Sequence, residues 1–545
     1  MLDNIPILSL ITFLPLLGAL ILLFIPKHRG RLIKIIATVV TIGTLVLTGW
    51  LYVDYDHSTA DTAQYTEEVE WIVAPLQKEG TQPLTSVSDF TLELNYKLSA
   101  DGLSVALLLL TALVAAAAVL ASWHIKKRWK LFYILFLLLL TGMLGVFCAR
   151  DLFLFFVFFE VTLVSTFFLI GIWGFNGREK AATKFLIYNG IGSALMLIGF
   201  IIVIATAGFN LALSETSASF YYTSDLDVIQ ENLVSAESVV NIPNEQFGPE
   251  GNPFGLTGGV AWLAFILLFV AFAIKLPIFP FHTWMLKVHA EAPPSIVMIH
   301  SGILLKMGAY GLIRFGMGLF PEQAQDFAFV LALLGVINII YGAIIAFRQT
   351  DIRLVLAYSS ISHMGIVLFG LAALNHVGLE GALFQMISHG LISALMFLIV
   401  GSIYERTGTM ELSDMSGLAK NIPFMSGMFL VAGLASLGLP GLSGFISEFM
   451  SFIGLFDSMP IITAIGTLGI ILTSVYVLRA VLRMTYGPSI ARFETIHDAR
   501  LIEAIPMIAL VAFIVLIGVY PSVLSEPLKF TVDQLVQNIA GKIGG

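Results

Sequence analysis

The sequence predicts an all-α polytopic membrane protein with about fourteen transmembrane helices, two inverted five-helix repeats and broken helices 7 and 12. Three observations lead to this prediction. Hydrophobic residues make up 58% of the 545 residues and charged residues 12%, with a mean hydropathy of +0.92, which is outside the range of soluble globular proteins. Apolar stretches of about 20 residues, long enough to cross a bilayer, follow one another along the chain. Two of them are interrupted by Gly and Pro beside an ionisable residue, as in inverted-repeat transporters.

The apolar stretches define the predicted helices in chain order. Only Arg150 and Asp151 separate the fourth helix from the fifth. The first stretch has no basic segment before it and no convincing cleavage site, and further spans follow, so we expect a retained helix and not a signal peptide. The predicted spans lie near residues 5–26, 32–53, 102–123, 131–149, 151–173, 182–208, 258–285, 293–317, 325–347, 352–374, 377–402, 423–455, 460–485 and 503–522.

These spans form four predicted units. Residues 1–123 hold three helices and an external β-hairpin loop, and residues 124–318 hold the first repeat, helices four to eight. Residues 319–486 hold the second, inverted repeat, helices nine to thirteen. Residues 487–545 hold the fourteenth helix and a tail that we expect to form a short helix along the membrane surface.

The two interrupted spans are the seventh and the twelfth. Pro277 and Pro280 follow Lys275 in the seventh, and the run GLPGLSG (438–444) precedes Glu448 in the twelfth. The breaks are five spans apart, an odd number, so the second unit is expected to be inserted upside down. A break exposes backbone polar groups and admits water, which proton or ion transfer requires.

The charges of the loops predict the orientation. The turns 27–34 (KHRGRLIK) and 124–130 (HIKKRWK) each carry four Lys or Arg and no acid. Loop 54–101 holds ten acids against two lysines, and loop 210–257 holds seven acids and no Lys or Arg. The positive-inside rule places the basic turns in the cytoplasm. Fourteen spans then put both termini outside, and the protein is expected in a bacterial plasma membrane.

The two acidic external loops differ in pattern. Loop 54–101 contains two alternating runs, EEVEWIV and TLELNYKL, which predict an external β-hairpin. Loop 210–257 shows little periodicity and is expected to be partly irregular. We expect both loops to form a structural cap.

Several classes of chemistry find no support in the sequence. A single cysteine, Cys148, excludes disulfides and argues against iron–sulfur clusters and cysteine-based zinc sites. We find no glycine-rich phosphate loop and no basic tract suited to nucleic acid. His282, His289 and His300 cluster near the first break without a metal-ligand spacing, so no metal site is predicted.

Two lysines in the membrane are the strongest functional signal. Lys275 stands beside the first break, and Lys306 has apolar helix on both sides, where it cannot easily reach an interface. A lysine deep in a bilayer costs several kcal/mol unless it is paired, hydrated or neutral. Desolvation favours loss of the proton, so Lys306 is predicted to be a proton site. Snorkelling to an interface is the alternative for Lys275.

Further buried ionisable groups complete a predicted relay. Glu160 lies in FFVFFEVTLVSTFF and is expected to bind a proton or to pair with Lys275, although a purely structural ion pair remains open. His363 and His389 lie in neighbouring spans and favour a water-bridged relay toward Glu448, the terminal group. Moving Glu160 relative to Lys275 would change the affinity of the central lysine for a proton.

The motifs as a set resemble a known family. KLPIFPFHTW, HAEAP, GILLKMGAYGLIRF, AYSSISHMG, the SHGL around His389, YERTGT and GLPGLSGFISEFM are similar to the antiporter-like subunits of respiratory complex I. The likeness extends from SADGLSVALLLLT at 99–111 to the last span. Sister L and N subunits and the Mrp antiporter D subunit usually carry lysine where this chain has Glu448, so the resemblance is to the M type, called ND4 in mitochondria and NdhD in chloroplasts.

The resemblance implies a function, partners and roles for residues. It implies proton translocation through Glu160 paired with Lys275, Lys306 as the central site, His363 and His389 as the relay, and Glu448 as the terminal site. It implies no cofactor in this chain itself, with FMN, iron–sulfur clusters and quinone held by other subunits of a NADH–quinone oxidoreductase. The implied partners are the L- and N-type subunits and the peripheral redox arm.

One departure and two alternatives remain. Where the family commonly reads HTW-L-P-D-A-H, this chain reads HTWMLKVH, with Leu286 and Lys287 in place of Pro and Asp. No role is expected for His300. The alternative functions are a subunit of a Mrp-type cation/proton antiporter and a passive scaffold that aligns neighbouring subunits.

Overall fold

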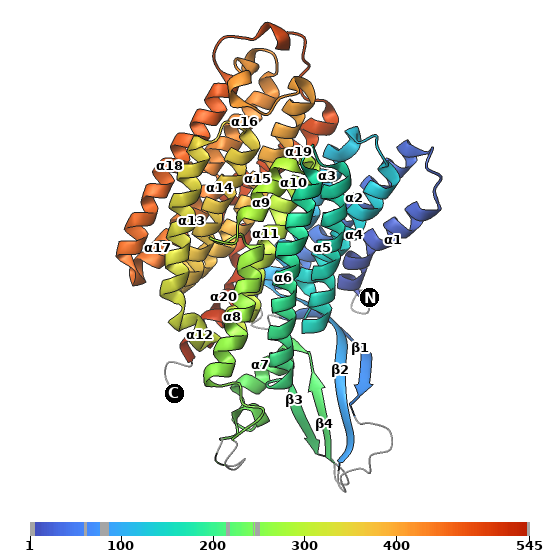
Figure 1. Ribbon diagram of the computed structural model, residues 1–545, viewed down its shortest axis with the longest axis vertical. Helices are drawn as coiled ribbons and strands as arrows, with labels where there is room; N and C mark the ends of the chain where they lie inside the picture. The colour runs from blue at the N-terminus through green and yellow to red at the C-terminus, as the bar shows by residue number, and fades with distance from the viewer. Residues whose placement is uncertain are drawn as a thin grey trace.

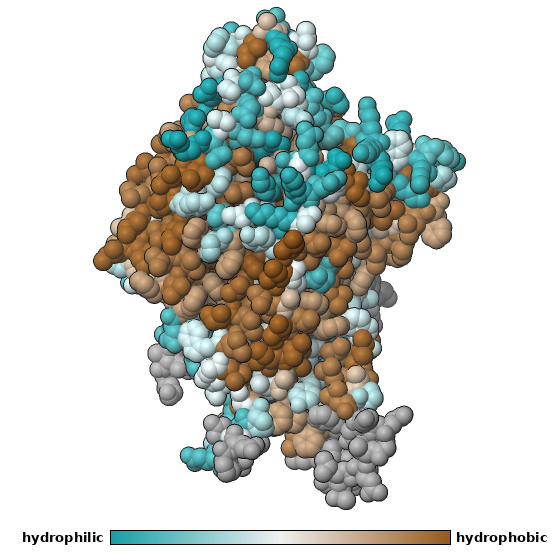
Figure 2. Space-filling view, in the orientation of Figure 1, coloured by the Kyte–Doolittle hydropathy of each residue, from teal (hydrophilic) through white to brown (hydrophobic). Residues whose placement is uncertain are grey.

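Helices make up most of the computed structural model, which describes residues 6–58, 63–76, 87–213, 218–243, 245 and 251–541. Figure 1 shows a bundle of roughly parallel helices with a small sheet projecting from one end. Figure 2 shows a broad hydrophobic band around the helices, with hydrophilic residues gathered at the end opposite the sheet. This distribution fits a protein that crosses a membrane, and the all-helical transmembrane class predicted from the sequence is confirmed.

Thirteen helices in the described part of the chain are long and apolar enough to cross a membrane. They correspond to the predicted spans except the twelfth, which is divided into two shorter helices. The count of fourteen and the inverted repeats stay predictions. The first half of the bundle contains α1 (Ile7–Phe24), α2 (Gly30–Asp54), α3 (Gly102–Ala121), α4 (Trp129–Cys148), α5 (Leu152–Trp173), α6 (Arg178–Ala205) and α8 (Gly258–Lys275).

The remaining helices complete the bundle. A continuous span consists of α10 (Pro294–Ile299), a π-helical turn (His300–Leu304), α11 (Leu305–Gly311) and a second π-helical turn (Leu312–Met317). The others are α9 (Thr283–Glu291), α12 (Pro321–Asp326), α13 (Ala328–Arg348), α14 (Ile352–Ala372), α15 (His376–Thr407), α16 (Pro423–Ser436), α17 (Ser443–Ser458), α18 (Pro460–Thr485), α19 (Leu501–Val519) and α20 (Ser522–Gly541).

Short polar side chains explain why several helices begin where they do. Asp151 accepts hydrogen bonds from the backbone N–H groups of Phe153 and Leu154 at the start of α5. A carboxylate at this position satisfies N–H groups that have no partner within the helix. The two residues Arg150 and Asp151 are therefore sufficient to end one span and begin the next, as the sequence predicted.

Both predicted helix breaks are present. The first span ends with α8 at Lys275, and the chain turns through residues 276–282 before α9 begins. The second break separates α16 from α17 at residues 437–442. The freed backbone groups at the first break find side-chain partners. Trp284 Nε1 donates to the Ile274 carbonyl over 3.0 Å, and the Phe279 N–H donates to Asn338 Oδ1 over 2.9 Å.

The predicted external hairpin is part of a four-stranded sheet. Strand β1 (Gln64–Pro75) pairs antiparallel with β2 (Val87–Ala100), which confirms the hairpin. Strands β3 (Phe209–Leu213) and β4 (Ala218–Thr223) form a second hairpin, and β4 pairs parallel with β2, giving the order β1-β2-β4-β3. This extension was not predicted, because segment 210–257 shows little alternation.

Buried charges connect the sheet end to the bundle. Asp101, between β2 and α3, forms ion pairs with Arg314 and, at 3.5 Å, with Arg150. Lys97 of β2 pairs with Asp225 at 2.7 Å, at the start of α7 (Leu226–Val234). Helix α20 packs against α3 and α15, so the predicted C-terminal helix is present and contacts the bundle.

Candidate functional site

The amine of Lys306 lies at the centre of the buried polar groups. Lys306 is 0% exposed and stands in α11, shortly after the π-helical turn His300–Leu304. A π turn disturbs the regular hydrogen-bond ladder of a helix, and such turns are frequent at functional sites. The carbonyl of Ser301, inside that turn, accepts a hydrogen bond from Lys306 Nζ. The amine is therefore held within the bundle and does not reach a membrane surface.

His389 of α15 is the next group. Lys306 Nζ lies 2.7 Å from His389 Nδ1, and His389 Nε2 lies 3.2 Å from Ser360 Oγ. Ser360 Oγ in turn lies 3.2 Å from Ser301 Oγ. An ammonium group has no lone pair, so His389 Nδ1 is the acceptor whenever Lys306 is protonated, and Nε2–H then donates to Ser360. These side chains bring three helices together through polar contacts.

The line of polar groups continues into α14 and α17. The ring centroids of His389 and His363 are 5.4 Å apart, and His363 Nδ1 lies 3.4 Å from Glu448 Oε1. Gln385 Nε2 also approaches His363 Nδ1, at 3.2 Å. All four side chains are buried. Four of the six residues predicted from the sequence are therefore successive neighbours: Lys306, His389, His363 and Glu448.

The second helix break shapes the end of this line. Gly438 in the break has φ +75°, a conformation that side chains rarely adopt, and a Cβ on it would lie 2.8 Å from Glu448 Oε2. Ser436, the last residue of α16, places its Oγ 3.2 Å from His363 Nε2. The break thus brings backbone and polar side chains against the two last groups of the line.

Lys275 and Glu160 lie apart from one another. Lys275 Nζ and Glu160 Oε1 each lack a hydrogen-bond partner among the described residues. The amine lies 4.6 Å from the ring centroid of Phe159 and 5.8 Å from that of Phe185. In the described structure no direct ion pair joins Glu160 and Lys275. The pairing of Glu160 with Lys275 therefore stays a prediction. It would require a movement of the two side chains toward each other or a bridging water.

Two histidines without a predicted role connect the surroundings of the two lysines. His289 Nε2 lies 3.0 Å from His300 Nδ1, and both side chains are 0% exposed. His300 begins the π-helical turn that precedes Lys306, and its ring packs against Phe185, the same ring that lies 5.8 Å from Lys275 Nζ. The available signal was the position of His300 in an apolar span, six residues before Lys306. No role is expected for His300 from the sequence, because the cluster that it forms with His282 and His289 has no metal-ligand spacing.

Comparison with protein families places these residues in a known context. The model of the family described as NADH:quinone oxidoreductase/Mrp antiporter, transmembrane, matches residues 149–473. The chain is 36% identical over 549 residues to NAD(P)H-quinone oxidoreductase chain 4 2 of Thermosynechococcus vestitus, covering 99% of this chain and 93% of that protein. It is 34% identical over 547 residues to NADH-quinone oxidoreductase subunit M of Rhodobacter capsulatus, covering 99% and 98%.

Solved structures show the same likeness. A chain of respiratory complex I from Thermus thermophilus with bound NADH superposes with a TM-score of 0.79 at 26% identity, covering 99% of this chain and 100% of that one. A chain of the Mrp complex from Dietzia sp. DQ12-45-1b gives a TM-score of 0.76 at 20% identity, covering 98% and 99%. The second likeness is one of fold alone.

Proposed function

The chain belongs to the NADH:quinone oxidoreductase/Mrp antiporter family of membrane subunits, and from this premise we propose that it is the proton-translocating M-type (chain 4) subunit of a NADH–quinone oxidoreductase. One observation supports the proposal above all others. Lys306, His389, His363 and Glu448 form a buried line of ionisable side chains that ends in α17, the second half of an interrupted span. A role in stepwise proton transfer explains several buried ionisable groups in succession better than a role in packing does.

The contacts define how a proton would move. Lys306 Nζ is within hydrogen-bond distance of His389 Nδ1, so a proton can pass directly between them once that nitrogen is unprotonated. The step from His389 to His363 has ring contact but no direct hydrogen bond, and a bridging water or Ser360 would carry it. His363 and Glu448 are close enough for the last transfer after a small rotation.

The energy for this movement comes from outside the chain in our proposal. Moving one charge against about 150 mV requires roughly 3.5 kcal/mol, scaled from 2.3 kcal/mol per 100 mV. We propose that quinone reduction in partner subunits supplies it and that FMN, iron–sulfur clusters and quinone are bound there. Glu160 and Lys275 would control proton binding at Lys306, because a movement of Glu160 toward Lys275 changes the electric field at Lys306.

The proposed setting follows from the same premise. The neighbours would be the L- and N-type membrane subunits and the peripheral redox arm. The membrane would be the plasma membrane of a bacterium, with the basic turns in the cytoplasm and both termini outside. The acidic sheet end would then face outward.

The decisive experiment is proton translocation by Lys306→Ala in inverted membrane vesicles that hold the whole complex. We expect NADH-driven acidification to fall at least tenfold in the number of protons moved per electron. Lys287→Ala is the matched control, because Lys287 is an exposed lysine on α9 outside the line. Unchanged pumping by Lys306→Ala would contradict the proposal and favour the passive scaffold.

A Mrp-type cation/proton antiporter subunit is the second candidate, and the shared fold with a Mrp chain supports it. It predicts proton exchange that depends on Na⁺ or K⁺ in vesicles that contain this protein without a redox arm. Co-purification of the chain with flavin, iron–sulfur signals and NADH–quinone activity would exclude this candidate as the main function.

A further inference from the structure

A large cavity opens at the end of the bundle opposite the sheet. Its volume is about 1010 Å³, which is the upper end of the range for small-molecule sites and far more than an ion or a few waters need. Helix ends surround it: α3, α5 and α15 end here, and α10 and α19 begin here. The cavity therefore lies where the apolar part of the bundle meets the polar end.

The rim of the cavity is cationic. Lys126, Lys127, Arg178 and Arg500 line it together with His124. Lys126 and Lys127 are exposed, and in the described part of the chain their amines have neither a hydrogen bond nor an ion pair. The loop that carries them, 124–130, is one of the two most basic turns of the protein. The rim thus offers positive charge that no described protein group neutralises.

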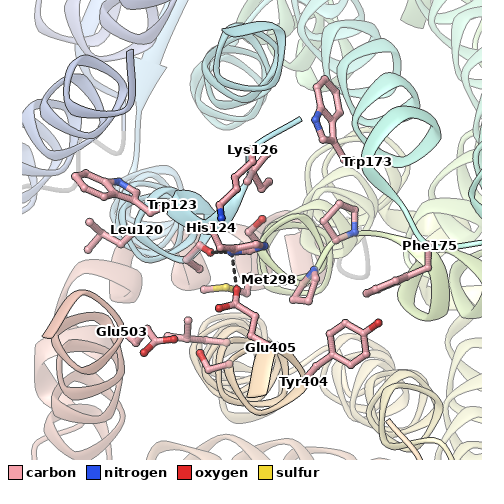
Figure 3. A pocket seen from close by; sticks show the side chains of 18 of the residues that line it. Leu120, Trp123, His124, Lys126, Trp173, Phe175, Met298, Tyr404, Glu405 and Glu503 are labelled. Atoms are coloured by element: carbon pink, nitrogen blue, oxygen red, sulfur yellow. Dashed lines mark hydrogen bonds and ion pairs between the residues drawn. The ribbon is translucent and has the colours of Figure 1, made fainter. Parts of the chain in front are cut away.

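The two acids of the cavity are already engaged. Glu405 lies 2.7 Å from His124 Nδ1, the contact drawn as a dashed line in Figure 3. Glu503 is held by Arg406 through two contacts, of 2.6 and 2.9 Å. Negative charge inside the cavity is therefore compensated locally, and the free lysines set the charge that an incoming molecule meets.

The inner wall is apolar, and aromatic side chains flank it. Leu120 and Met298 line the inside, and Trp123 and Trp173 lie on opposite sides of the opening (Figure 3). Trp173 Nε1 donates to the Lys127 carbonyl over 2.6 Å, which connects the indole to the basic loop. Indoles at this level are typical of the membrane–water boundary. The cavity therefore suits a molecule with an anionic head and an apolar chain.

We propose that this cavity binds an anionic phospholipid, with its phosphate between Lys126 and Lys127 and its acyl chains along the apolar wall. Basic pockets between transmembrane helices on the cytoplasmic side are a known form of lipid recognition. Zwitterionic lipids gain less, because their own ammonium group offsets the phosphate. This proposal is independent of proton translocation, since none of its cations belongs to the buried line.

The test is photo-crosslinking of the purified complex in phosphatidylcholine vesicles that contain a small fraction of diazirine-labelled phosphatidylglycerol. We expect crosslinks on the peptides that hold Leu120 and Trp173. The double variant Lys126→Ala with Lys127→Ala should reduce them about 30-fold, given the usual attraction of a lysine near an anionic lipid. Arg29→Ala with Arg31→Ala is the matched control, because it removes two exposed cations from the other basic turn.

Three outcomes would overturn the proposal. Equal loss of crosslinks in both double variants would show general attraction to the surface and no site. Equal labelling by a phosphatidylcholine probe would remove the headgroup preference. Suppression by inorganic phosphate at concentrations that leave vesicle charge unchanged would indicate a site for a free anion.

Discussion

At the scale of single residues, Lys275 and Lys306 show how burial alone does not define a role. Both amines are buried, at 1% and 0% exposure. Lys306 Nζ donates a hydrogen bond to a backbone carbonyl and lies next to an imidazole nitrogen, and this nitrogen can accept its proton. Lys275 faces aromatic rings, which stabilise a cation but accept no proton. In our proposal Lys306 therefore exchanges protons, and Lys275 holds a charge that Glu160 can modulate.

Glu448→Gln tests the end of the line. Glutamine keeps the shape but cannot bind the proton that His363 delivers, so we expect the protons moved per electron to fall roughly tenfold or more. NADH oxidation and vesicle acidification are measured together to obtain this ratio. Glu494→Gln, the same change at an exposed position, should leave the ratio unchanged. Full pumping by Glu448→Gln would exclude Glu448 as the terminal site.

Asp101 provides a prediction about stability and pH. Burial raises the pKa of Asp101, but Arg314 and Arg150 outweigh this effect and lower its pKa to about 2. The carboxylate therefore stabilises the fold above about pH 4, and this contribution is lost as the pH falls from 4 toward 2. Asp101→Asn removes it at every pH and leaves the buried guanidinium group of Arg314 without its ion-pair partner.

We expect Asp101→Asn to reduce the free energy of unfolding by about 3 kcal/mol at neutral pH, as for a broken buried pair. Thermal melting of the detergent-purified complex, followed by tryptophan fluorescence, would measure it. Between pH 4 and 3 the difference from the unsubstituted protein should begin to shrink. A constant difference over that range would show that the ion pair is not its source.

The sequence predicted the residues of the site better than their contacts. Lys306, His389, His363 and Glu448 could be found because an ionisable group in an apolar helix is conspicuous in one dimension. The separation between Glu160 and Lys275 could not be predicted, because side-chain rotamers and distances of a few ångströms leave no pattern in a sequence. The contact between His300 and His289 could not be predicted either, because it depends on a turn between two helices.

At the scale of helices and strands, proline and glycine made both breaks predictable, whereas the π-helical turns of the Lys306 span were not. A π turn differs from an α-helix by one residue per hydrogen-bonded ring, and an apolar sequence such as HSGIL carries no mark of it. The consequence is functional, because the Ser301 carbonyl that contacts Lys306 belongs to this turn.

Gly438→Ala tests the geometry of the second break. The added Cβ would require an unfavourable φ and would lie 2.8 Å from Glu448 Oε2, so the carboxylate must move relative to His363. We expect assembly of the complex to persist and proton translocation to fall several-fold. Gly427→Ala in α16 is the control, because a Cβ there meets nothing within 4 Å. Equal pumping by both variants would show that the carboxylate position is not critical.

At the scale of the whole molecule, the loop charges predict which end faces the cytoplasm. The single cysteine, Cys148, is buried at 1% exposure, so the unsubstituted chain gives a low background for thiol labelling. Glu237→Cys at the sheet end and Lys127→Cys at the basic end introduce exposed thiols. We expect a membrane-impermeant maleimide to label Glu237→Cys in intact cells and Lys127→Cys only after permeabilisation. The opposite pattern would invert the predicted topology.

The large-scale arrangement was predictable where it depends on hydrophobicity. The positions of the spans could be predicted from apolar runs, and the β1–β2 hairpin from alternation. Strands β3 and β4 were not predicted, because they are short and gain their stability from β2, which is distant in sequence. Tertiary pairing of this kind overrides weak local preference.

The parallel pairing of β2 with β4 also means that β2 must wait during synthesis for a partner strand that is made much later. The ribosome makes β4 roughly 120 residues after β2, and α3 to α6 must enter the membrane in between. At about 5–20 residues per second, β2 has one open edge for on the order of ten seconds. The acidic residues of loop 54–101, which contains β2, disfavour pairing of this open edge with a second nascent chain during that interval. Slowing translation within α3–α6 should therefore increase the yield of misassembled protein.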